Sequence, residues 1–405
     1  MSASAPAEAE ICVVGAGIVG LATARELQLR HPEATIAVLE RAGSIAAEQS
    51  GHSSGVIHAG VYYEPGSLKA RLCVDGSRRL YAFCEERAIP ARRSGKVIVA
   101  ASEADLPRLD ELERRGRAND VPGLERIGAD RLREIEPHAA GAAALHSPAT
   151  GIVDFAAVAA AIAADFERAG GRLALGCEVR GLEPRADRLE IAHSGGRTLA
   201  RRTAVCAGPW ADRLAIAAGA DRDPRLVPFR GAYLRLRPEA DHLVRSNIYP
   251  VPDPDLPFLG VHLTRNAAGE VLLGPTALLV GARDAYRLRR IVPRDLVESV
   301  AWPGTWRMIR RHWRTGLAEL RHAFSIRSFV AECRRYLPEL GVGDVERSPH
   351  AGVRAQAIAR DGTLVDDFLI SETEHAVHLR NAPSPAATSA FALAEVIADR
   401  LDALG

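Results

Sequence analysis

The chain of 405 residues has little lysine and almost no net charge. Of its 52 basic residues, 50 are arginine and two are lysine, Lys69 and Lys96. We interpret this bias as an effect of GC-rich codons, so a single arginine says little about function and each lysine draws attention. The net charge of +1 argues against a general nucleic-acid binder, which needs a basic surface. The hydrophobic content of 47% argues against a disordered chain.

Long apolar runs and paired cysteines are also missing. No stretch reaches the roughly 18 apolar residues that can span a bilayer. Residues 1–8 contain no basic residue ahead of an apolar run, so we expect a short flexible tail and no secretory signal. The six cysteines are scattered, without the spacing of a metal site. We therefore expect buried, reduced thiols, no metal and a cytoplasmic protein.

The first ordered segment has the pattern of a βαβ unit that binds a dinucleotide. Predicted strands at 11–14 and 35–39 flank a predicted helix that runs through Leu29. Three glycines in the turn before the helix allow the backbone to approach a pyrophosphate closely: Gly15, Gly17 and Gly20. Glu40, at the end of the second strand, is placed to accept the ribose hydroxyls.

The middle of the chain predicts a change of architecture. Asp154 is a good N-cap for an alanine-rich helix that runs through Ala169. Strand-like runs follow at 172–182, 188–193 and 203–208. From about 224 to 281, alternating segments separated by prolines predict an antiparallel sheet and a second domain.

A basic segment with tryptophans follows at 289–335, which contains eleven arginines and four acidic residues. Five apolar residues share one face of a predicted helix: Trp306, Ile309, Trp313, Leu317 and Leu320. Such a helix can lie in a membrane interface. The simpler interpretation is that its apolar face packs on the second domain and its arginines are solvated. Peripheral membrane contact through 302–320, on the inner face of the membrane, stays open.

The end of the chain favours a flavin over NAD. The segment 381–388 precedes a predicted helix through Leu401, with Ser384 as N-cap and Pro385 as the first helical residue. The positive end of such a helix would stabilise a reduced flavin, which is anionic at N1. An NAD domain has no need of a C-terminal helix that returns to the same sheet.

Several segments together resemble the L-2-hydroxyglutarate oxidase/dehydrogenase family, FAD enzymes of the D-amino-acid-oxidase-like fold group. The most specific are 51–70 (GHSSGVIHAGVYYEPGSLKA) and 381–388 (NAPSPAAT). The others are 227–231 (VPFRG), 249–254 (YPVPDP), 257–262 (PFLGVH) and 351–356 (AGVRAQ).

This resemblance implies an α/β (α+β) fold with a discontinuous Rossmann-like FAD domain of the glutathione-reductase type. The predicted FAD-binding domain comprises 1–90, 151–225 and 345–405. The predicted substrate domain, with its antiparallel sheet, comprises 91–150 and 226–344, and includes the basic segment at about 295–335.

The resemblance also implies the reaction and the cofactor contacts. A 2-hydroxy dicarboxylic acid, L-2-hydroxyglutarate first of all, would lose a hydride from C2 to flavin N5 and become the 2-oxo acid. The residues implied to bind FAD are Gly15, Gly17, Ile18, Val19, Gly20, Glu40, Arg41, Ser50, His52, Ser54, Gly55, Val179, Ala207, Gly208, Pro383, Ser384, Pro385, Ala386 and Thr388.

On the substrate side, the motifs favour five residues: Arg354, Lys69, His58, His262 and Tyr63. Arg354 is the first choice to grip a carboxylate through two parallel N–H bonds, and Lys69 is a second cation, unless it is a surface residue of a helix. His58 is the favoured base because imidazole titrates near neutrality. His262 and His350 are rivals for that role. Tyr63 would hydrogen-bond the substrate.

The chain departs from the family pattern at three single residues, Ser53, Ala232 and Thr276, and in a smaller stretch through Gly281-Ala282. These departures put the identity of the substrate in doubt more than the chemistry. A FAD-dependent oxidase of another hydroxy acid, an amino acid or an amine is the nearest alternative. An NAD-dependent dehydrogenase and a non-catalytic nucleotide-binding or membrane-scaffold protein are more distant ones. Oxygen, a quinone or a carrier protein would each serve as electron acceptor.

Overall fold

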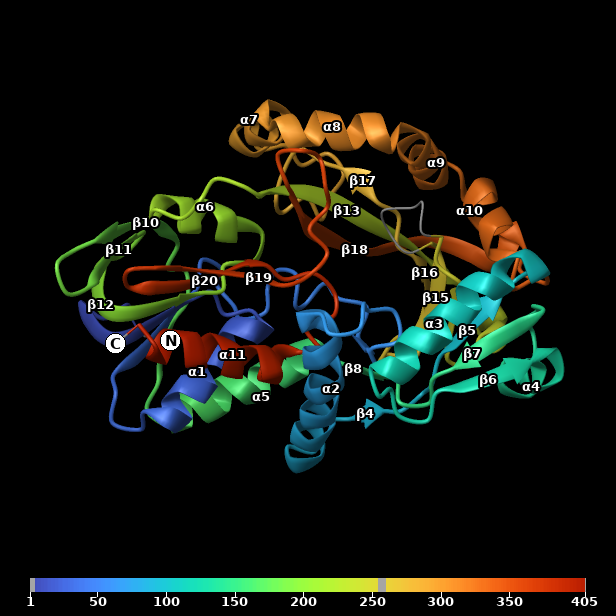
Figure 1. The fold of residues 1–405 in the computed structure, drawn as a ribbon, viewed down its shortest axis with the longest axis horizontal. Helices are drawn as coiled ribbons and strands as arrows, with labels where there is room; N and C mark the ends of the chain where they lie inside the picture. The colour runs from blue at the N-terminus through green and yellow to red at the C-terminus, as the bar shows by residue number, and fades with distance from the viewer. Residues whose placement is uncertain (1–3, 254–259, 405) are drawn as a thin grey trace.

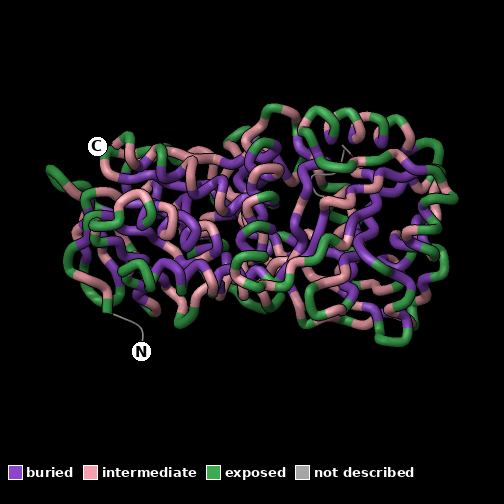
Figure 2. The backbone as a smooth tube through the Cα atoms, turned by 90° about the horizontal axis from the view of Figure 1, so that it is seen from below, coloured by how far each residue is buried: buried purple, intermediate pink, exposed green. Residues whose placement is uncertain are grey.

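Two large β-sheets lie side by side along the length of the molecule (Figure 1). The computed structural model describes residues 4–253 and 260–404. Parts of two resemblance segments, residues 254 and 257–259, lie outside the described residues. In the view of Figure 2, buried backbone runs through both halves of the molecule and exposed backbone lies mostly at their rims.

The first sheet carries the predicted dinucleotide-binding unit. Its strands run in the order β10-β11-β12-β1-β2-β9, and β20 with β19 is attached to β12. The strands are β1 Glu8–Val14, β2 Ile36–Leu39, β9 Arg172–Ala174, β10 Val179–Pro184, β11 Leu189–His193, β12 Gly196–Val205, β19 Leu369–Thr373 and β20 Ala376–Asn381. β1 pairs in parallel with both β2 and β12. β2 and residues 11–14 of β1 are fully buried, which explains their continuous apolar sequence.

Three helices, α1, α5 and α11, cover one face of this sheet, and α6 lies on the other side (Figure 1). They are α1 Ile18–Arg30, α5 Phe155–Arg168, α6 Ala211–Ala217 and α11 Ala390–Asp402. Asp154 caps α5 as predicted, because its carboxylate accepts the amide of Ala156 at 2.8 Å. The sheet also joins residues far apart in the sequence, since β20 pairs with β12.

The second sheet has the order β17-β13-β16-β15-β14-β5-β7-β6, with β18 paired to β13. Its strands are β5 Val97–Ala100, β6 Glu125–Gly128, β7 Ala143–His146, β13 Arg225–Leu236, β14 Asn247–Pro250, β15 His262–Arg265, β16 Val271–Gly274, β17 Leu278–Leu279 and β18 Val345–Ile358. Most pairs are antiparallel, as predicted for this region, and β14 with β5 is a parallel pair. β18 belongs to this sheet, although the predicted domain boundary at residue 345 assigned it to the FAD-binding part.

A small third sheet and two groups of helices complete the fold. The third sheet consists of β3 Val56–Ile57, β4 Ala91–Arg92 and β8 Gly151–Val153. The helices are α2 Leu68–Glu86, α3 Leu106–Ala118, α4 Ala129–Ile135, α7 Pro293–Ala301, α8 Pro303–Arg311, α9 Trp313–Phe324 and α10 Ile326–Cys333. In the described part of the chain, no helix combines the length and the apolarity needed to cross a membrane.

Two predicted elements are wrong in their extent. The run 172–182 is two strands, because Gly176 takes a positive φ of 68° and donates its N–H to Ala42, which turns the chain between β9 and β10. The basic segment is not one helix: it breaks at Trp302, at His312 and at Ser325, which separate α7, α8, α9 and α10. α8 contacts β18 whereas α9 contacts β17, so the helices follow different strands of the sheet.

Candidate active site

A cavity of about 1280 Å³ extends from the glycine turn after β1 to the second sheet. Gly15 and Glu40 line it at the first sheet, and Tyr249 and His262 line it at the second sheet. Every residue of the predicted FAD set lines this cavity, as do the five predicted substrate-side residues. The rival base His350 is not among the lining residues.

The glycine turn provides a cradle that side chains would fill. Gly15 has a φ of 104°, a conformation that favours glycine. A Cβ atom at Gly15 would collide with the carbonyl oxygen of Cys206, and one at Gly20 would collide with that of Gly15. Strand β1, the turn and α1 therefore pack against each other through backbone, which leaves the N-terminus of α1 open to the cavity.

Glu40 ends β2 with a carboxylate that is held by backbone amides. Oε2 accepts the N–H of Ala16 at 2.7 Å, and Oε1 accepts the N–H of Ala42 at 2.8 Å. Burial raises the pKa of Glu40, and the two amide bonds oppose that shift. Each oxygen keeps lone pairs for ribose hydroxyls. The glycine cradle and this oriented carboxylate fit the pyrophosphate and ribose of a bound FAD.

The C-terminal turn differs from its prediction. Ser384 is not the N-cap of the last helix, because α11 begins at Ala390, with Ser389 as N-cap. Residues 385–388 form turns, and the amide of Ser389 donates to Pro385. The argument from the positive end of a helix beginning at Pro385 therefore does not hold. Ser384 instead lies 3.2 Å from His58, Oγ to Nε2.

His58 follows β3 and is held at its backbone and at its ring. Its amide donates to Oγ1 of Thr388 at 3.1 Å. Nδ1 is buried without a hydrogen-bond partner among the described residues. Burial lowers the pKa of His58 well below 6.5, and the positive charges of Lys96, Lys69 and Arg354 add to that shift. The imidazole is therefore neutral near pH 7 and can accept a proton.

Two cationic side chains line the cavity, one from β18 and one from α2. Arg354 lies on β18, opposite Phe229 of β13. Lys69 is the second residue of α2, and its ammonium lies 2.9 Å from Oδ1 of Asp366 and 5.0 Å from the centre of the Tyr63 ring. Lys69 is 6% exposed. The alternative of a surface lysine is therefore wrong.

Sequence reasoning missed three tyrosines and one lysine at the second-sheet end of the cavity. Tyr62, Tyr233 and Tyr249 line the cavity, and the hydroxyl of Tyr62 is buried without a partner among the described residues. Tyr62 and Tyr249 fall inside the resemblance segments, which was a usable signal. Lys96 packs against two of these rings, and its only signal in the sequence was the rarity of lysine.

Two of the three single-residue departures from the family pattern lie outside the cavity lining. Ala232 and Thr276 contact each other, with the amide of Ala232 donating to Oγ1 of Thr276 at 3.0 Å. Neither residue lines the cavity, whereas Ser53 does. Ala232 and Thr276 are therefore joined to each other by hydrogen bonds at the back of the lining residues.

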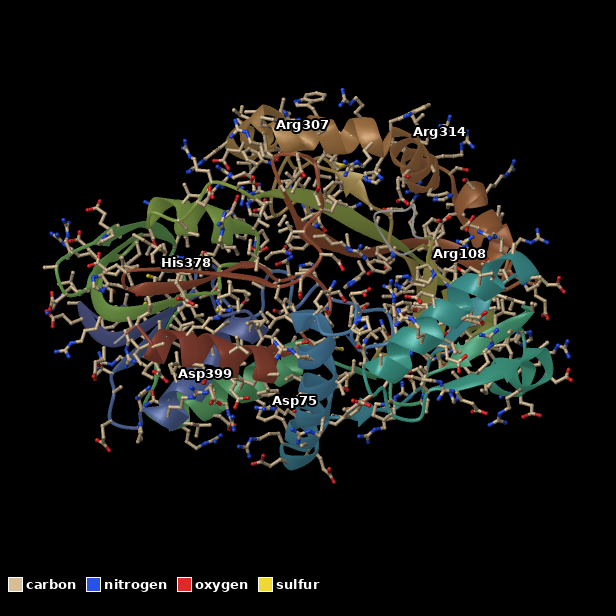
Figure 3. The ribbon with its side chains drawn as sticks, in the orientation of Figure 1. Asp75, Arg108, Arg307, Arg314, His378 and Asp399 are labelled. Carbon is tan, nitrogen blue, oxygen red and sulfur yellow. The ribbon has the colours of Figure 1, made fainter. Side chains whose placement is uncertain are left out.

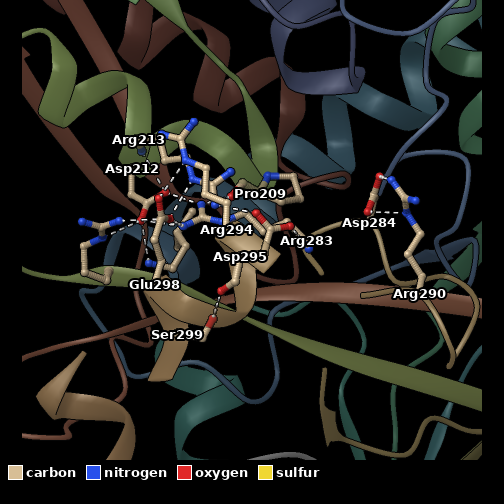
Figure 4. Close-up of polar contacts among 12 residues, drawn as sticks. Pro209, Asp212, Arg213, Arg283, Asp284, Arg290, Arg294, Asp295, Glu298 and Ser299 are labelled. Carbon is tan, nitrogen blue, oxygen red and sulfur yellow. Dashed lines mark hydrogen bonds and ion pairs between the residues drawn. The ribbon is translucent and has the colours of Figure 1, made fainter. Parts of the chain in front are cut away.

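A buried ion-pair network ties the second sheet to the flavin side (Figure 4). Arg283 is 2% exposed and donates to both oxygens of Asp212 and to the carbonyl of Pro209, next to the cavity-lining Gly208. Its own amide donates to Asp295 on α7 at 2.8 Å. The network therefore connects α7, α6 and the turn after β12.

Comparison with known proteins places the chain in a family. Residues 10–400 match the DAO family, described as FAD dependent oxidoreductase. L-2-hydroxyglutarate dehydrogenase, mitochondrial, of Nematostella vectensis is 44% identical over 410 residues, 96% of this chain and 90% of that protein. The Homo sapiens protein of the same name is 42% identical over 409 residues, 97% and 88%. L-2-hydroxyglutarate dehydrogenase of Escherichia coli (strain K12) is 41% identical over 398 residues, 98% and 93%.

Solved structures support the fold. Dithionite reduced L-alpha-glycerophosphate oxidase from Mycoplasma pneumoniae with FAD bound superposes with a TM-score of 0.78 at 21% identity, covering 98% of this chain and 95% of that one. Glycine oxidase from Geobacillus kaustophilus gives 0.73 at 19% identity, covering 98% and 95%. The α/β fold with a second antiparallel sheet and the FAD cofactor are thus confirmed, and an NAD-dependent dehydrogenase is excluded. The chain belongs to the DAO family of FAD dependent oxidoreductases.

Proposed function

We propose that the protein oxidises L-2-hydroxyglutarate to 2-oxoglutarate. The observation that carries the proposal is the set of cationic and neutral basic groups at the substrate end of the cavity, which suits a doubly charged acid. Arg354 and Lys69 supply positive charge there, and the imidazoles of His58 and His262 lie beside them. The near full-length similarity to L-2-hydroxyglutarate dehydrogenases supports the same substrate.

Arg354 binds one carboxylate of the substrate in this proposal. A guanidinium matches a carboxylate with two parallel N–H bonds and fixes its plane, which a lysine cannot do. Arg354 stands on a long strand that pairs with β13 on both sides of its position, so its backbone is firmly placed. Anchoring one end of the acid orients its C2 hydroxyl toward the base.

His58 accepts the proton of the substrate hydroxyl. Its pKa lies well below 6.5 because of burial, so the ring is ready to accept a proton at neutral pH. Ser384 and Thr388 hold it on the side of the flavin segment. The flavin, when bound, supplies the acceptor for the hydride that leaves C2. Tyr63 and Lys69 complete the wall of the site.

Anaerobic mixing of the oxidised holoenzyme with acids tests this function. We expect L-2-hydroxyglutarate to bleach the flavin absorbance, and glutamate and lactate to leave it unchanged at equal concentration. Bleaching by glutamate and not by the hydroxy acid would support an amino-acid oxidase instead. If none of the three acids reduced the flavin, the assignment of the substrate would be wrong.

We further propose that electrons leave toward a quinone at a membrane surface. Eight large apolar side chains are exposed on α7, α8 and α9: Leu296, Val297, Val300, Trp306, Trp313, Leu317, Leu320 and Phe324. Figure 3 labels Arg307 and Arg314 on α8 and α9, at the outer edge of the molecule. Exposed tryptophan beside arginine suits the interface of an anionic bilayer. The arginines of α8 and α9 are exposed. Of the predicted apolar face, Ile309 packs beside Met308, whereas the other four side chains are exposed.

Vesicle flotation tests the membrane contact. We expect the holoenzyme to float with vesicles containing phosphatidylglycerol and to remain below vesicles of phosphatidylcholine alone. A variant with Trp306→Ser and Trp313→Ser should stay below both, while keeping anaerobic flavin reduction. Reoxidation of the reduced enzyme by a water-soluble quinone analogue, compared with oxygen, identifies the acceptor. Faster reoxidation by oxygen, or equal flotation of the variant, would contradict the proposal.

A further inference from the structure

Lys96 is a buried lysine that has no anionic partner in the described part of the chain. It stands just before β5, where its amide donates to the carbonyl of Ser147 at 3.1 Å and its carbonyl accepts the amide of Ser147 at 2.8 Å. The residue is 1% exposed. Among the described residues, its ammonium forms no ion pair, whereas the other lysine, Lys69, is paired with Asp366.

The ammonium of Lys96 is held against two phenol rings. Nζ lies 4.5 Å from the centre of the Tyr62 ring and 4.9 Å from that of Tyr249. Aromatic faces attract a cation, but they replace water poorly. Burial therefore lowers the pKa of Lys96 to about 7. A buried cation without a counter-ion lowers stability, so its retention calls for a functional reason.

The two phenols stand between Lys96 and the cavity. Tyr62 and Tyr249 line the cavity, and Lys96 does not. The hydroxyl of Tyr249 lies 3.3 Å from Oγ1 of Thr264, whereas that of Tyr62 has no partner among the described residues. His262 extends this wall, since its ring stacks on Tyr249 at 4.1 Å between centres. This wall of the cavity therefore contains a buried hydroxyl without a partner among the described residues, on a ring that has a positive charge behind it.

We propose that Lys96 is a positioning residue that makes the cavity selective for doubly charged acids, acting through Tyr62 and Tyr249. The inference rests on the proposed function, because the second carboxylate of the substrate supplies the missing anion. The positive charge behind Tyr62 makes its hydroxyl a stronger hydrogen-bond donor toward that carboxylate. Arg354 holds the first carboxylate, so the two ends of the acid are recognised by different elements.

Binding of a dianion should therefore be coupled to uptake of a proton. Three groups face Lys96. The rings of Tyr62 and Tyr249 contact its ammonium, and the thiol of Cys73 interacts with it electrostatically. Burial raises the pKa of Cys73 to about 12, so the thiol is neutral at pH 8. The nearby imidazoles of His58 and His262 have lowered pKa values and are also neutral there. At pH 8 a bound dianion would restore the proton of Lys96.

Binding of product and its monoacid analogue to the oxidised holoenzyme tests the inference. 2-Oxoglutarate and 2-oxopentanoate have the same chain length and differ by one carboxylate. Their dissociation constants come from the change in flavin absorbance, and proton uptake comes from calorimetry in two buffers at pH 8. We expect Lys96→Met to lower the preference for the diacid by about tenfold or more, the order of a single partly buried charge. Proton uptake should disappear.

Further variants separate charge from packing. Lys96→Arg keeps a charge that cannot be lost near pH 8, so it should retain the preference for the diacid without proton uptake. Arg347→Met removes an exposed arginine that does not line the cavity, and it should leave the proton uptake in place. Tyr62→Phe keeps the ring and Lys96 but should also lower the preference, and it decides the matter if Lys96→Met does not fold.

The outcomes distinguish this inference from the proposed function. If the wild-type holoenzyme does not bind 2-oxoglutarate, the proposed substrate is wrong. If it binds, and Lys96→Met keeps both the preference for the diacid and the proton uptake, the role of Lys96 is wrong. If Lys96→Met does not fold, an unchanged preference for the diacid in Tyr62→Phe would show that the role of Lys96 is wrong.

Discussion

Ser384 holds the ring of His58 from the far end of the chain, with Oγ 3.2 Å from Nε2 although 326 positions separate the two residues. Thr388, from the same turn, accepts the amide of His58. The turn before α11 therefore sets both the backbone and the ring of the proposed base. The same turn lines the cavity, so the base and the cofactor site share one support.

Replacing His58 by glutamine should leave the site formed and remove the base. Glutamine can still hydrogen-bond Ser384, but it cannot accept a proton near neutral pH. We expect the rate of anaerobic flavin reduction at saturating L-2-hydroxyglutarate to fall by about 10²–10⁴-fold. The FAD content, measured from the absorbance ratio, should stay at the wild-type value.

Ser384→Ala is the matched control, because it removes one hydrogen bond to the ring and leaves the imidazole. Its reduction rate should fall less than that of His58→Gln. Wild-type reduction by His58→Gln would exclude His58 as the base, and His262→Gln would then be the variant to examine.

The acid limb of the pH profile of kcat/KM should lie below pH 6.5. Burial and neighbouring positive charges hold the pKa of His58 below 6.5, so lowering the pH from 8 to 6.5 leaves the base unprotonated. kcat/KM, which reports the groups of the free enzyme, should therefore not decline on that account in this range. On the alkaline side, Lys96 loses its proton above about pH 7, which should lower kcat/KM for a diacid.

Steady-state kinetics from pH 5 to 9 measure both limbs. An acid limb centred above pH 6.5 that disappears in His58→Gln would show that burial does not depress its pKa. An alkaline limb that is identical in Lys96→Met would assign that limb to another group.

How far the sequence predicted the structure depends on the distance over which contacts act. The βαβ unit, the cap at Asp154 and the sheet class follow from local patterns, and they are confirmed. The predicted start of α11 was wrong, because the hydroxyl of Ser384, the predicted N-cap, contacts the ring of His58 instead. That contact spans most of the chain. A local rule for helix caps has no access to such a competitor.

The site shows the same division between local and distant information. Residues inside specific motifs, such as Arg354, line the cavity as the sequence predicted. Their chemical roles remain proposals. Lys96 carried no motif. Its importance depends on the parallel pairing of β5 with β14, which brings it under Tyr249 from about 150 residues away. That pairing joins elements whose separate patterns say nothing about each other.

Arg354→Met should mainly impair substrate binding. Removing a hydrogen-bonded charge that faces a carboxylate costs about 2–5 kcal/mol, and we expect kcat/KM for L-2-hydroxyglutarate to fall accordingly. Arg354→Lys should recover little, because an ammonium cannot form two parallel bonds to a carboxylate. Arg347→Met, on the exposed side of the same strand β18, is the control and should keep wild-type kinetics. Equal effects of the variants at 354 and 347 would contradict the assignment.

Glu40→Gln should weaken the binding of FAD. The carboxylate accepts the amides of Ala16 and Ala42, and a glutamine would turn an N–H₂ group toward one of them. Losing a charged hydrogen bond costs about 1.5–3 kcal/mol, so we expect the dissociation constant of FAD to rise by about 10–100-fold. Reconstitution of the apoprotein, followed by flavin fluorescence, measures it. Glu33→Gln, at an exposed position before β2, should bind FAD as the wild type does.

The buried network around Asp212 should decide the stability of the holoenzyme. Arg283→Met leaves Asp212 with fewer partners in a site where both side chains are almost fully buried. Removing one partner of a buried pair costs about 3–5 kcal/mol. Arg294 belongs to the same network, but its side chain is 73% exposed and is paired with Glu298 at 3.1 Å. Its ion pair lies in water, where such pairs contribute about 0–1 kcal/mol.

Urea unfolding of Arg283→Met and Arg294→Met, followed by circular dichroism and by flavin fluorescence, compares the two sites. We expect a large loss in the free energy of unfolding for Arg283→Met and almost none for Arg294→Met. Because Arg283 also donates to the carbonyl of Pro209, beside the cavity-lining Gly208, flavin release should precede loss of the circular dichroism signal in that variant. Equal losses in the two variants would show that burial does not govern this network, and simultaneous transitions would show that Arg283 stabilises the fold without supporting the flavin site.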